Sequence, residues 1–249
     1  MSDSNSMNCN FVVITPAFNC EEKIERTLYS IAGQTYKNWK MIVIDDMSTD
    51  ETRKAVLEFS RRNHLEEKIT VISRNEKYGE TRNTHEIVNT LDPESVVVRV
   101  DAGDFLTDLG CFEFLNALYS NYDPAVLWTA HRWAFTEQNI SGPLDPSVNV
   151  YEQPWRSSHL KTFRVRDFLD LNEKNFKDDE GNWIMIGCDQ AVFLPMMERA
   201  RRKGRKLIFF PRVMYHYDIN LQDPELFTKK RSLDQKHSAE RTRERGYIE

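Results

Sequence analysis

Short apolar runs alternate with amphipathic stretches over the first half of the chain. The runs predict four buried strands, at 11–15, 39–45, 68–73 and 95–101. Between them, hydrophobic side chains recur at helical spacing and predict helices at 21–34, 51–62, 79–91 and 109–120. Fully apolar strands separated by helices are typical of a mostly parallel sheet that is covered on both sides. The pattern therefore predicts an α/β fold.

Two of the predicted helices are preceded by a capping pattern. Asn19 is followed three residues later by Glu22, and Ser48 is followed in the same way by Glu51. A short polar side chain with a Glu three residues on matches the capping box. Asn19 and Ser48 are therefore expected to begin these helices.

The second half of the chain is less regular. Its predicted elements are a strand at 125–135, a long loop at 136–157, a helix at 186–200, strands at 206–210 and 213–217, and a polar tail at 229–249. Pro195 lies inside the predicted helix, so a kink or a late start is expected there.

Polar side chains gather where the predicted parallel strands end. Asp45 and Asp46 end the second strand, and Asp101 and Asp104 follow the fourth. Ligands of open parallel sheets bind at the carboxyl ends of the strands. We therefore expect a ligand site at this edge.

Composition narrows the class of protein. The 249 residues carry 34 basic and 39 acidic side chains, a net charge of −5, which argues against nucleic acid as the main partner. No apolar run approaches the ~18–20 residues of a membrane-spanning helix, and residues 1–10 lack the pattern of a secretory signal. The scattered cysteines favour neither a zinc site nor disulfides and predict a cytoplasmic protein. They are Cys9, Cys20, Cys111 and Cys188.

Four segments give the chain a specific resemblance. They are Ile14–Thr52, with TPAFN, QTY, DD and STDET in order, Gly79–Asn83 (GETRN), Val100–Leu106 (VDAGDFL) and Gly187–Gln190 (GCDQ). Together they resemble glycosyltransferase family 2, whose members have the GT-A fold, over roughly residues 10–200. The resemblance implies a Rossmann-like, mostly parallel central sheet with flanking helices and an irregular acceptor-side C-terminal half.

The expected organisation follows from this resemblance. It consists of a flexible N-terminus at 1–10, a single transferase domain at 11–228 and a polar tail at 229–249. Within the domain, residues 11–108 are expected to bind the nucleotide and residues 109–228 the acceptor.

The resemblance also implies a nucleotide-sugar site. Asp46 takes the place that faces the uracil base, with Asp45 beside it, and Asp46 is expected to matter more. The turn under the base is formed by Thr15, Pro16, Ala17, Phe18 and Asn19. Arg82 matches a cation near the diphosphate. The plainer alternatives are an Asp that caps a helix, an ordinary turn and a solvated helical Arg.

Residues 101–104 match the family's DxD motif incompletely. Asp101 occupies the first position, as a ligand of ribose or metal, but Gly103 replaces the Asp that typically binds the ion. The resemblance then assigns a divalent cation, Mn²⁺ or Mg²⁺, to Asp101, Asp104 and, as a compensating late ligand, His216. The missing Asp leaves a second interpretation open, a degenerate protein that binds nucleotide sugars without catalysis.

Asp189 stands where the family places its general base, with Cys188 in place of a Glu. Inverting transfer needs one carboxylate to take the proton of the acceptor hydroxyl. Alternatively, Asp189 caps the following helix, whose dipole would lower its pKa. Trp155 and His159 are expected on the acceptor side, with a structural role as the alternative.

These features predict an inverting hexosyltransferase. It is expected to move a sugar from a nucleotide sugar, with a UDP-sugar as the favoured donor, to a hydroxyl of a glycan or another acceptor. A nucleotidyltransferase is disfavoured because TPAFN lacks a glycine-rich, basic phosphate loop. A response-regulator-like domain would leave residues 125–249 unexplained.

Overall fold

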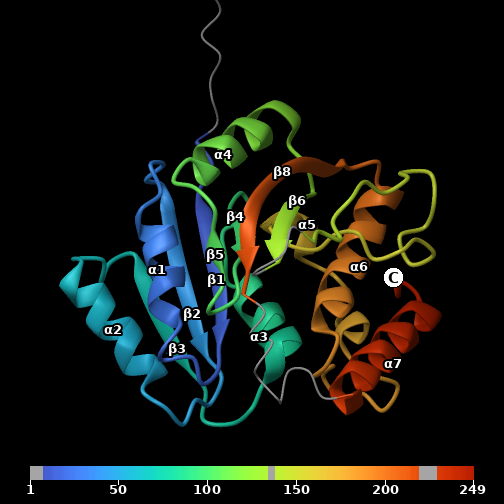
Figure 1. Cartoon of the computed structure of the whole chain (residues 1–249). Coiled ribbons are helices and arrows are strands. Elements are labelled where there is room, and N and C mark those ends of the chain that lie inside the picture. Colours follow the sequence, from blue (N-terminus) through green and yellow to red (C-terminus); the bar gives the residue numbers. More distant parts are fainter. Residues whose placement is uncertain (1–7, 134–137, 219–228) are drawn as a thin grey trace, which may run out of the picture.

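A sheet of eight strands runs through the protein (Figure 1). The computed structural model describes residues 8–133, 138–218 and 229–249. The strands lie in the order β3-β2-β1-β4-β7-β6-β8-β5. Their bounds are β1 Phe11–Ala17, β2 Trp39–Asp45, β3 Ile69–Ser73, β4 Val96–Arg99, β5 Phe105–Leu106, β6 Val126–Trp133, β7 Lys161–Arg164 and β8 Leu207–Tyr217.

The first half of the sheet is parallel, as the apolar runs predict. β3, β2, β1 and β4 are parallel neighbours, and Val13 of β1 lies between Met41 of β2 and Val98 of β4. Successive side chains of a strand point to opposite faces. Val13 accordingly belongs to one buried cluster and Ile14 to another. The sheet thus separates two hydrophobic cores.

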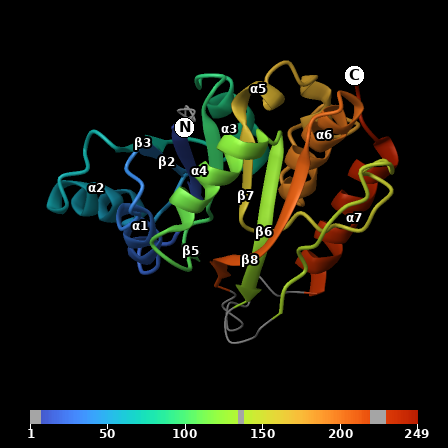
Figure 2. The same ribbon diagram turned by 90° about the horizontal axis from the view of Figure 1, so that it is seen from above.

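Helices cover both faces of the sheet (Figures 1 and 2). The first cluster includes residues of α1 (Ile24–Ala32), α2 (Thr52–Arg62) and α4 (Cys111–Tyr122). The second includes residues of α3 (Gly79–Val88), α5 (Val165–Phe168), the short 3₁₀ helix η1 (Glu173–Phe176) and α6 (Cys188–Arg202). The expectation of a sheet covered on both sides is therefore confirmed.

The capping prediction for the first two helices is wrong. α1 begins at Ile24 and α2 at Thr52. Asn19 instead accepts a hydrogen bond from the N–H of Thr49 (2.8 Å), and Ser48 Oγ accepts one from the N–H of Asn19 (3.1 Å). The two side chains bond across neighbouring turns rather than within their own helices, because β1 and β2 end side by side. They therefore join the two turns at the edge where the ligand site is expected.

The second half of the sheet is antiparallel in part. β7 runs antiparallel to both β4 and β6, and β5 runs antiparallel to β8. Neither β5 nor β7 was predicted, because both are short and β7 (KTFR) is largely polar. The strands expected at 206–210 and 213–217 form one strand, β8, with irregular pairing to β6 around Pro211. A proline lacks the N–H for a regular ladder, so it lies at this irregularity.

Two further expectations concern the C-terminal half. α6 starts at Cys188 and continues through Pro195, so the late start is wrong. Residues 229–249 form helix α7 (Lys229–Arg245), and Arg243 of α7 donates to the side chain of Gln190 (2.7 Å) and the carbonyl of Tyr151 (2.7 Å). The polar segment is therefore part of the packed structure, against α6.

Three stretches named in the sequence predictions lie partly outside the described residues. These are residues 1–7 of the N-terminus, 134–137 between the predicted strand and loop, and 219–228 before α7. Residues 138–157 run as an irregular loop, as predicted. Within the described ranges, no helix combines the length and the apolar character that crossing a membrane would require.

Candidate active site

The side chains that carry the expected chemistry meet at the carboxyl ends of β1, β2 and β4. Ala17 and Asp45 are opposite each other in the register of β1 and β2. The segment from Asp101 to Asp104 follows directly after β4, and β7 and β8 bring further residues from the second half. The candidate side chains therefore gather at the predicted edge of the sheet.

The turn after β1 forms one wall of this site. Thr15 is completely buried, yet its Oγ1 has no hydrogen-bond partner among the described residues. Phe18 is 47% exposed, and the ammonium of Lys77 lies 3.0 Å from the centroid of its ring. A buried hydroxyl without a partner and an exposed aromatic ring leave this turn able to contact a ligand.

Asp46 has a structural role that its sequence context did not reveal. Its carboxylate accepts hydrogen bonds from the N–H groups of Tyr78 and Gly79 (3.0 Å each) and from the side chain of Asn83 (3.0 Å). These donors belong to the start of α3, so Asp46 fixes that helix end to the end of β2. A carboxylate offers about four acceptor positions, so these bonds leave one, on the oxygen that lies 3.9 Å from the Lys77 ammonium.

The carboxylate of Asp45 accepts fewer hydrogen bonds from the described residues than that of Asp46. Its Oδ1 accepts one hydrogen bond, from the N–H of Ser48 (3.0 Å), and the residue is 7% exposed. The sequence left open that one Asp at this strand end caps a helix. Asp46 has this role, because it accepts hydrogen bonds from the N–H groups at the start of α3. Both carboxylates stay candidates for contacting the nucleotide.

Replacing Asp46 by Ala is expected to lower both nucleotide affinity and stability. UDP affinity should fall roughly tenfold or more, because a hydrogen bond to a charged group contributes about 1.5–3 kcal/mol. The stability loss, on the order of 2–4 kcal/mol, follows from the three donors left at the start of α3. Calorimetry with UDP and urea unfolding measure the two effects. Asp45→Ala is the matched control, for which stability should change less.

Arg82, which was expected near the diphosphate, is engaged with two other side chains in this structure. Its guanidinium lies 3.5 Å from the centroid of the Tyr78 ring and pairs with Glu86 (2.9 Å). The predicted phosphate contact would need the side chain to leave these partners. Two buried cations that the sequence predictions missed, Arg99 and Lys161, lie deeper in the site.

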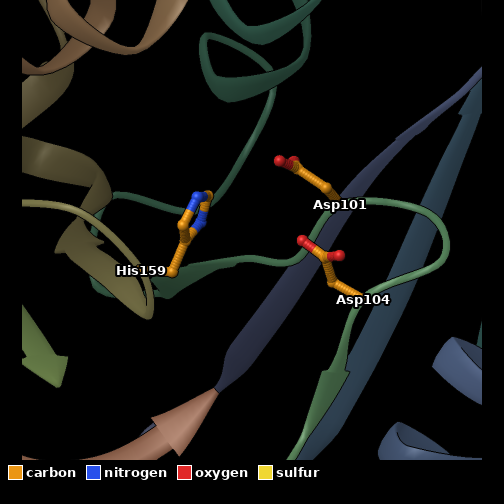
Figure 3. A group of neighbouring side chains, drawn as sticks. All are labelled: Asp101, Asp104 and His159. Atoms are coloured by element: carbon orange, nitrogen blue, oxygen red, sulfur yellow. The ribbon is translucent and has the colours of Figure 1, made fainter. Parts of the chain in front are cut away.

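Asp101, Asp104 and His159 converge on one point (Figure 3). One ligand-type atom from each lies within 4.8 Å of the others. His159 Nδ1 is buried and forms no hydrogen bond with the described residues, and Asp101 Oδ1 is buried with the Arg99 guanidinium 3.1 Å away as its ion-pair partner. Two carboxylates and one imidazole suit Mn²⁺. This donor set, with the buried His159 Nδ1 making no hydrogen bond to the described residues, fits a divalent cation.

His159, expected on the acceptor side, therefore lies with Asp101 and Asp104; we call these three residues the metal-type group. Its ring is stacked between those of Tyr215 and Tyr217, at centroid distances of 4.7 and 4.9 Å. Burial and the nearby Lys161 charge lower the pKa of His159 to about 4. The imidazole is consequently neutral at pH 7, the state in which it can bind a metal.

His216, predicted as the compensating metal ligand, does not join this group. Tyr215 and Tyr217 point toward His159, so the residue between them points to the opposite face of β8. The ring of His216 stacks there on Phe105, at 4.5 Å between centroids. The alternation of side chains along the strand explains why the prediction was wrong.

The departure at Gly103 has a conformational reason. Gly103 has a φ of +98°, which side-chain-bearing residues rarely adopt. The turn is held by Thr27, whose Oγ1 accepts from the N–H of Gly103 (2.9 Å) and donates to the carbonyl of Asp104 (2.7 Å). This turn brings the Asp104 carboxylate back beside that of Asp101. An Asp at position 103 would be strained.

Asp104 is almost fully buried and is held in a fixed orientation. Tyr215 OH donates to one carboxylate oxygen (2.6 Å) and the N–H of Asp218 donates to the other (2.8 Å). Burial and the neighbouring Asp101 charge raise the pKa of Asp104 well above its usual value. Because a nearby cation would offset this repulsion, the electrostatics also favour a metal.

Arg99 connects the metal-type group with α3. Its guanidinium pairs with Glu80 (2.7 Å) and with Asp101 (3.1 Å), and its side chain is only 4% exposed. A charged residue inside an apolar strand (VVVRV) was the sequence signal for it. Arg99→Leu is expected to cost roughly 3–5 kcal/mol of stability, because two carboxylates lose their counter-ion. Urea unfolding measures this loss, and Glu80→Gln in the same background should recover part of it.

Asp189 occupies the first turn of α6 and pairs with the ammonium of Lys161. Lys161 is completely buried, whereas the Asp189 side chain is 41% exposed. Burial opposes ionisation of Asp189, but the Lys161 charge outweighs it and lowers the pKa to about 2. No side-chain cap of α6 is formed, so the capping alternative is not borne out. Asp189 is thus an ionised carboxylate that solvent can reach.

Trp155, expected on the acceptor side, has different partners from Trp133, the last residue of β6. Trp155 lies near Lys161, with the ammonium 5.7 Å from its ring centroid. Trp133 donates its indole N–H to His131 Nε2 (2.7 Å). Trp155 is therefore the one that lies beside the Lys161–Asp189 pair.

The solved structures that superpose on this chain include one in complex with UDP and one in complex with GDP-Man and Mn²⁺. The Staphylococcus aureus protein TarS, residues 1–349 in complex with UDP, superposes with a TM-score of 0.62 over 92% of this chain and 68% of that chain, at 17% identity. A mannosyltransferase from Pyrobaculum calidifontis, in complex with GDP-Man and Mn²⁺, superposes with a TM-score of 0.56 over 86% and 58%, at 20% identity. The chain therefore has the GT-A fold.

The sequence comparison identifies the family. The family model for glycosyl transferase family 2 matches residues 12–177, and the chain belongs to this family of glycosyltransferases. TuaG of Bacillus subtilis, whose name makes it a glycosyltransferase of teichuronic acid biosynthesis, is 37% identical over 67 residues, 27% of this chain and 25% of TuaG. WfgD of Escherichia coli, named UDP-Glc:α-D-GlcNAc-diphosphoundecaprenol β-1,3-glucosyltransferase, is 48% identical over 48 residues, 19% of each chain. These matches span a quarter or less of each relative.

Proposed function

We propose that the protein is an inverting, metal-dependent transferase that uses a UDP-sugar and transfers its hexose to a hydroxyl of a glycan. The observation that carries this proposal is the convergence of Asp101, Asp104 and His159 near the ionised Asp189. Such a transfer needs a cation site that can neutralise the leaving diphosphate and a carboxylate that can accept the proton of the acceptor hydroxyl. Both lie at the same edge of the sheet.

Asp101, Asp104 and His159 would hold the divalent cation. When bound, a divalent cation supplies charge neutralisation for a leaving diphosphate. Tyr215 and the N–H of Asp218 keep the Asp104 carboxylate in place, and the two tyrosine rings keep the imidazole of His159 in its plane. The residues of this site are thus oriented before any ligand binds.

Asp189 is the proposed general base. Its carboxylate accepts the proton of the acceptor hydroxyl while the hydroxyl oxygen attacks the anomeric carbon from the face opposite the leaving group. A pKa of about 2 keeps Asp189 ionised at neutral pH. Lys161 fixes one carboxylate oxygen, which leaves the other oxygen to meet the acceptor.

UDP is the proposed nucleotide, and Asp45, Asp46 and the turn 15–19 are its proposed contacts. The S. aureus structure contains UDP, and the E. coli relative carries UDP-Glc in its name, which supports this choice. The Thr15 hydroxyl, which has no hydrogen-bond partner among the described residues, and an Asp46 carboxylate oxygen are proposed to contact the base or ribose. Mn²⁺ is favoured over Mg²⁺ because an imidazole takes part in the site.

A panel of nucleotide sugars, with release of free nucleotide as the readout, tests this function. Release is expected with a UDP-sugar and Mn²⁺, and EDTA should abolish it. The Gly103 departure provides the alternative of a non-catalytic binding protein. Tight UDP binding without release from any donor, over a range of acceptors, would support that alternative against the transferase.

A further inference from the structure

A cavity of about 460 Å³ lies between α7 and the loop before α6. Trp183, Met185 and Ile186 contribute apolar surface to it, and Asp234, His237 and Arg241 of α7 contribute polar groups. Its volume lies within the roughly 300–1,000 Å³ of small-molecule sites. None of the roles assigned above uses these residues.

The cavity adjoins the proposed reaction centre through its apolar wall. Met185 packs against Gly79, where an added Cβ would lie 2.5 Å from the methionine sulfur. Gly79 is also the residue whose N–H binds Asp46. The carbonyl of Ile186 accepts a hydrogen bond from Ser238 of α7 (2.5 Å), and Asp189 follows three residues later. The same loop therefore borders the cavity, the nucleotide side and the proposed base.

The lining has the mixed chemistry that binds sugars. Met185 and Ile186 are large apolar side chains that stay 46% and 38% exposed, which suits the C–H face of a pyranose. The side chains of Asp234, His237 and Arg241 make no hydrogen bond or ion pair with any residue that the structure describes. Together they offer both hydrogen-bond donors and hydrogen-bond acceptors, which suits the neutral hydroxyl groups of a sugar.

The same lining disfavours other ligands. Asp178, Asp179 and Asp234 outnumber the two arginines of the lining, Arg241 and Arg245, so the cavity offers no excess positive charge to a phosphate or another anion. An apolar chain would leave the charged side chains on α7 without water or partners. A neutral, polyhydroxylated ligand avoids both costs.

We propose that this cavity binds the sugar unit adjoining the reacting unit of a glycan acceptor. This inference rests on the proposed function, because it places the reacting hydroxyl at Asp189 and the next unit between the 183–186 loop and α7. The acceptor is then a saccharide of at least two units. Acceptor selection by α7 follows, although residues 229–249 look like a polar tail in the sequence.

The test compares acceptors of two lengths. Methyl glycosides of glucose, galactose and their N-acetylated amino sugars, and disaccharides ending in the same units, are titrated into the full chain with UDP and Mn²⁺. Saturation-transfer NMR and calorimetry report binding. At least one disaccharide should bind ten times or more tightly than its terminal monosaccharide. Arg241→Ala and Asp234→Asn should each reduce that difference at least threefold.

Matched controls come from the same helix. Lys236 and Glu240 are 69% and 51% exposed and do not line the cavity. Lys236→Ala and Glu240→Gln should therefore keep the full difference between disaccharide and monosaccharide. UDP affinity should be unchanged in all four variants, which separates this test from that of the nucleotide site.

Two results would overturn the inference. One is that no saccharide of the panel binds the wild-type protein while UDP does. The other is a length preference that survives in the Asp234→Asn/Arg241→Ala double variant, which would place the second sugar unit elsewhere. Failure of UDP itself to bind would count against the proposed function.

Discussion

Asp189→Asn should reduce sugar transfer by about 10²–10⁴-fold, the usual contribution of a general base. An amide cannot take the proton of the acceptor hydroxyl, whereas the side chain keeps its size. UDP affinity should stay within a few-fold, because Asp189 pairs with Lys161 and lies outside the nucleotide-binding turn. Initial rates with the best donor, together with calorimetry of UDP binding, measure the two effects. Unchanged turnover would remove Asp189 from the chemistry.

The same substitution should also lower stability. It leaves the completely buried Lys161 ammonium without its anionic partner. Loss of one member of a fully buried pair costs about 3–5 kcal/mol, and the 41% exposure of Asp189 reduces this to roughly 1–3 kcal/mol. The Lys161→Met/Asp189→Asn double variant is the control. It should regain stability but not activity, which distinguishes a catalytic defect from a folding defect.

Removal of the divalent cation is the second change expected to have a large effect. EDTA should lower transfer on the order of 10²–10³-fold or more, because neutralisation of a leaving diphosphate contributes several kcal/mol. His159→Ala and Asp104→Asn should weaken Mn²⁺-dependent UDP binding at least tenfold. His216→Ala is the matched control, because that imidazole stacks on Phe105 on the other face of β8. Equal UDP affinity with and without metal in the wild-type protein would contradict the metal site.

The pH dependence of metal binding should follow Asp104. Burial and Asp101 raise its pKa, so at a given pH more of Asp104 is protonated than of an ordinary Asp, and a binding cation competes with that proton. Mn²⁺ affinity should therefore rise with pH as Asp104 ionises. His159, with a pKa of about 4, is already neutral and contributes little above pH 5. Titration with Mn²⁺ at several pH values measures this, and a flat profile would exclude Asp104 as the titrating ligand.

The sequence predicted the parallel half of the fold because burial on both faces leaves a strong local signal. The apolar runs at 11–15, 39–45 and 68–73 correspond to β1, β2 and β3. β7 was missed because four residues with the sequence KTFR show neither an apolar run nor a regular alternation. Its place between β4 and β6 is decided by partners far away in the chain.

The candidate site shows the same division. Asp45, Asp46, Asp101 and Asp104 could be placed together from the sequence because they stand at the ends of predicted strands, and such ends meet at one edge of a parallel sheet. His159, Lys161 and Arg99 were misassigned or missed, because a lone charged side chain carries no local sign of its partners. His216 was preferred over His159 although only the stacking of rings across β8 distinguishes them.

By itself, the sequence determined the order of strands and helices in the first half, the family and the edge of the sheet at which the candidate side chains gather. Each of these depends on the periodicity of side chains or on residues close together along the chain. The tertiary structure alone decided that Asp46 also fixes α3, that a turn at Gly103 directs Asp104 toward Asp101, and that α7 packs against α6. These features depend on contacts between residues distant in sequence, which local patterns do not encode.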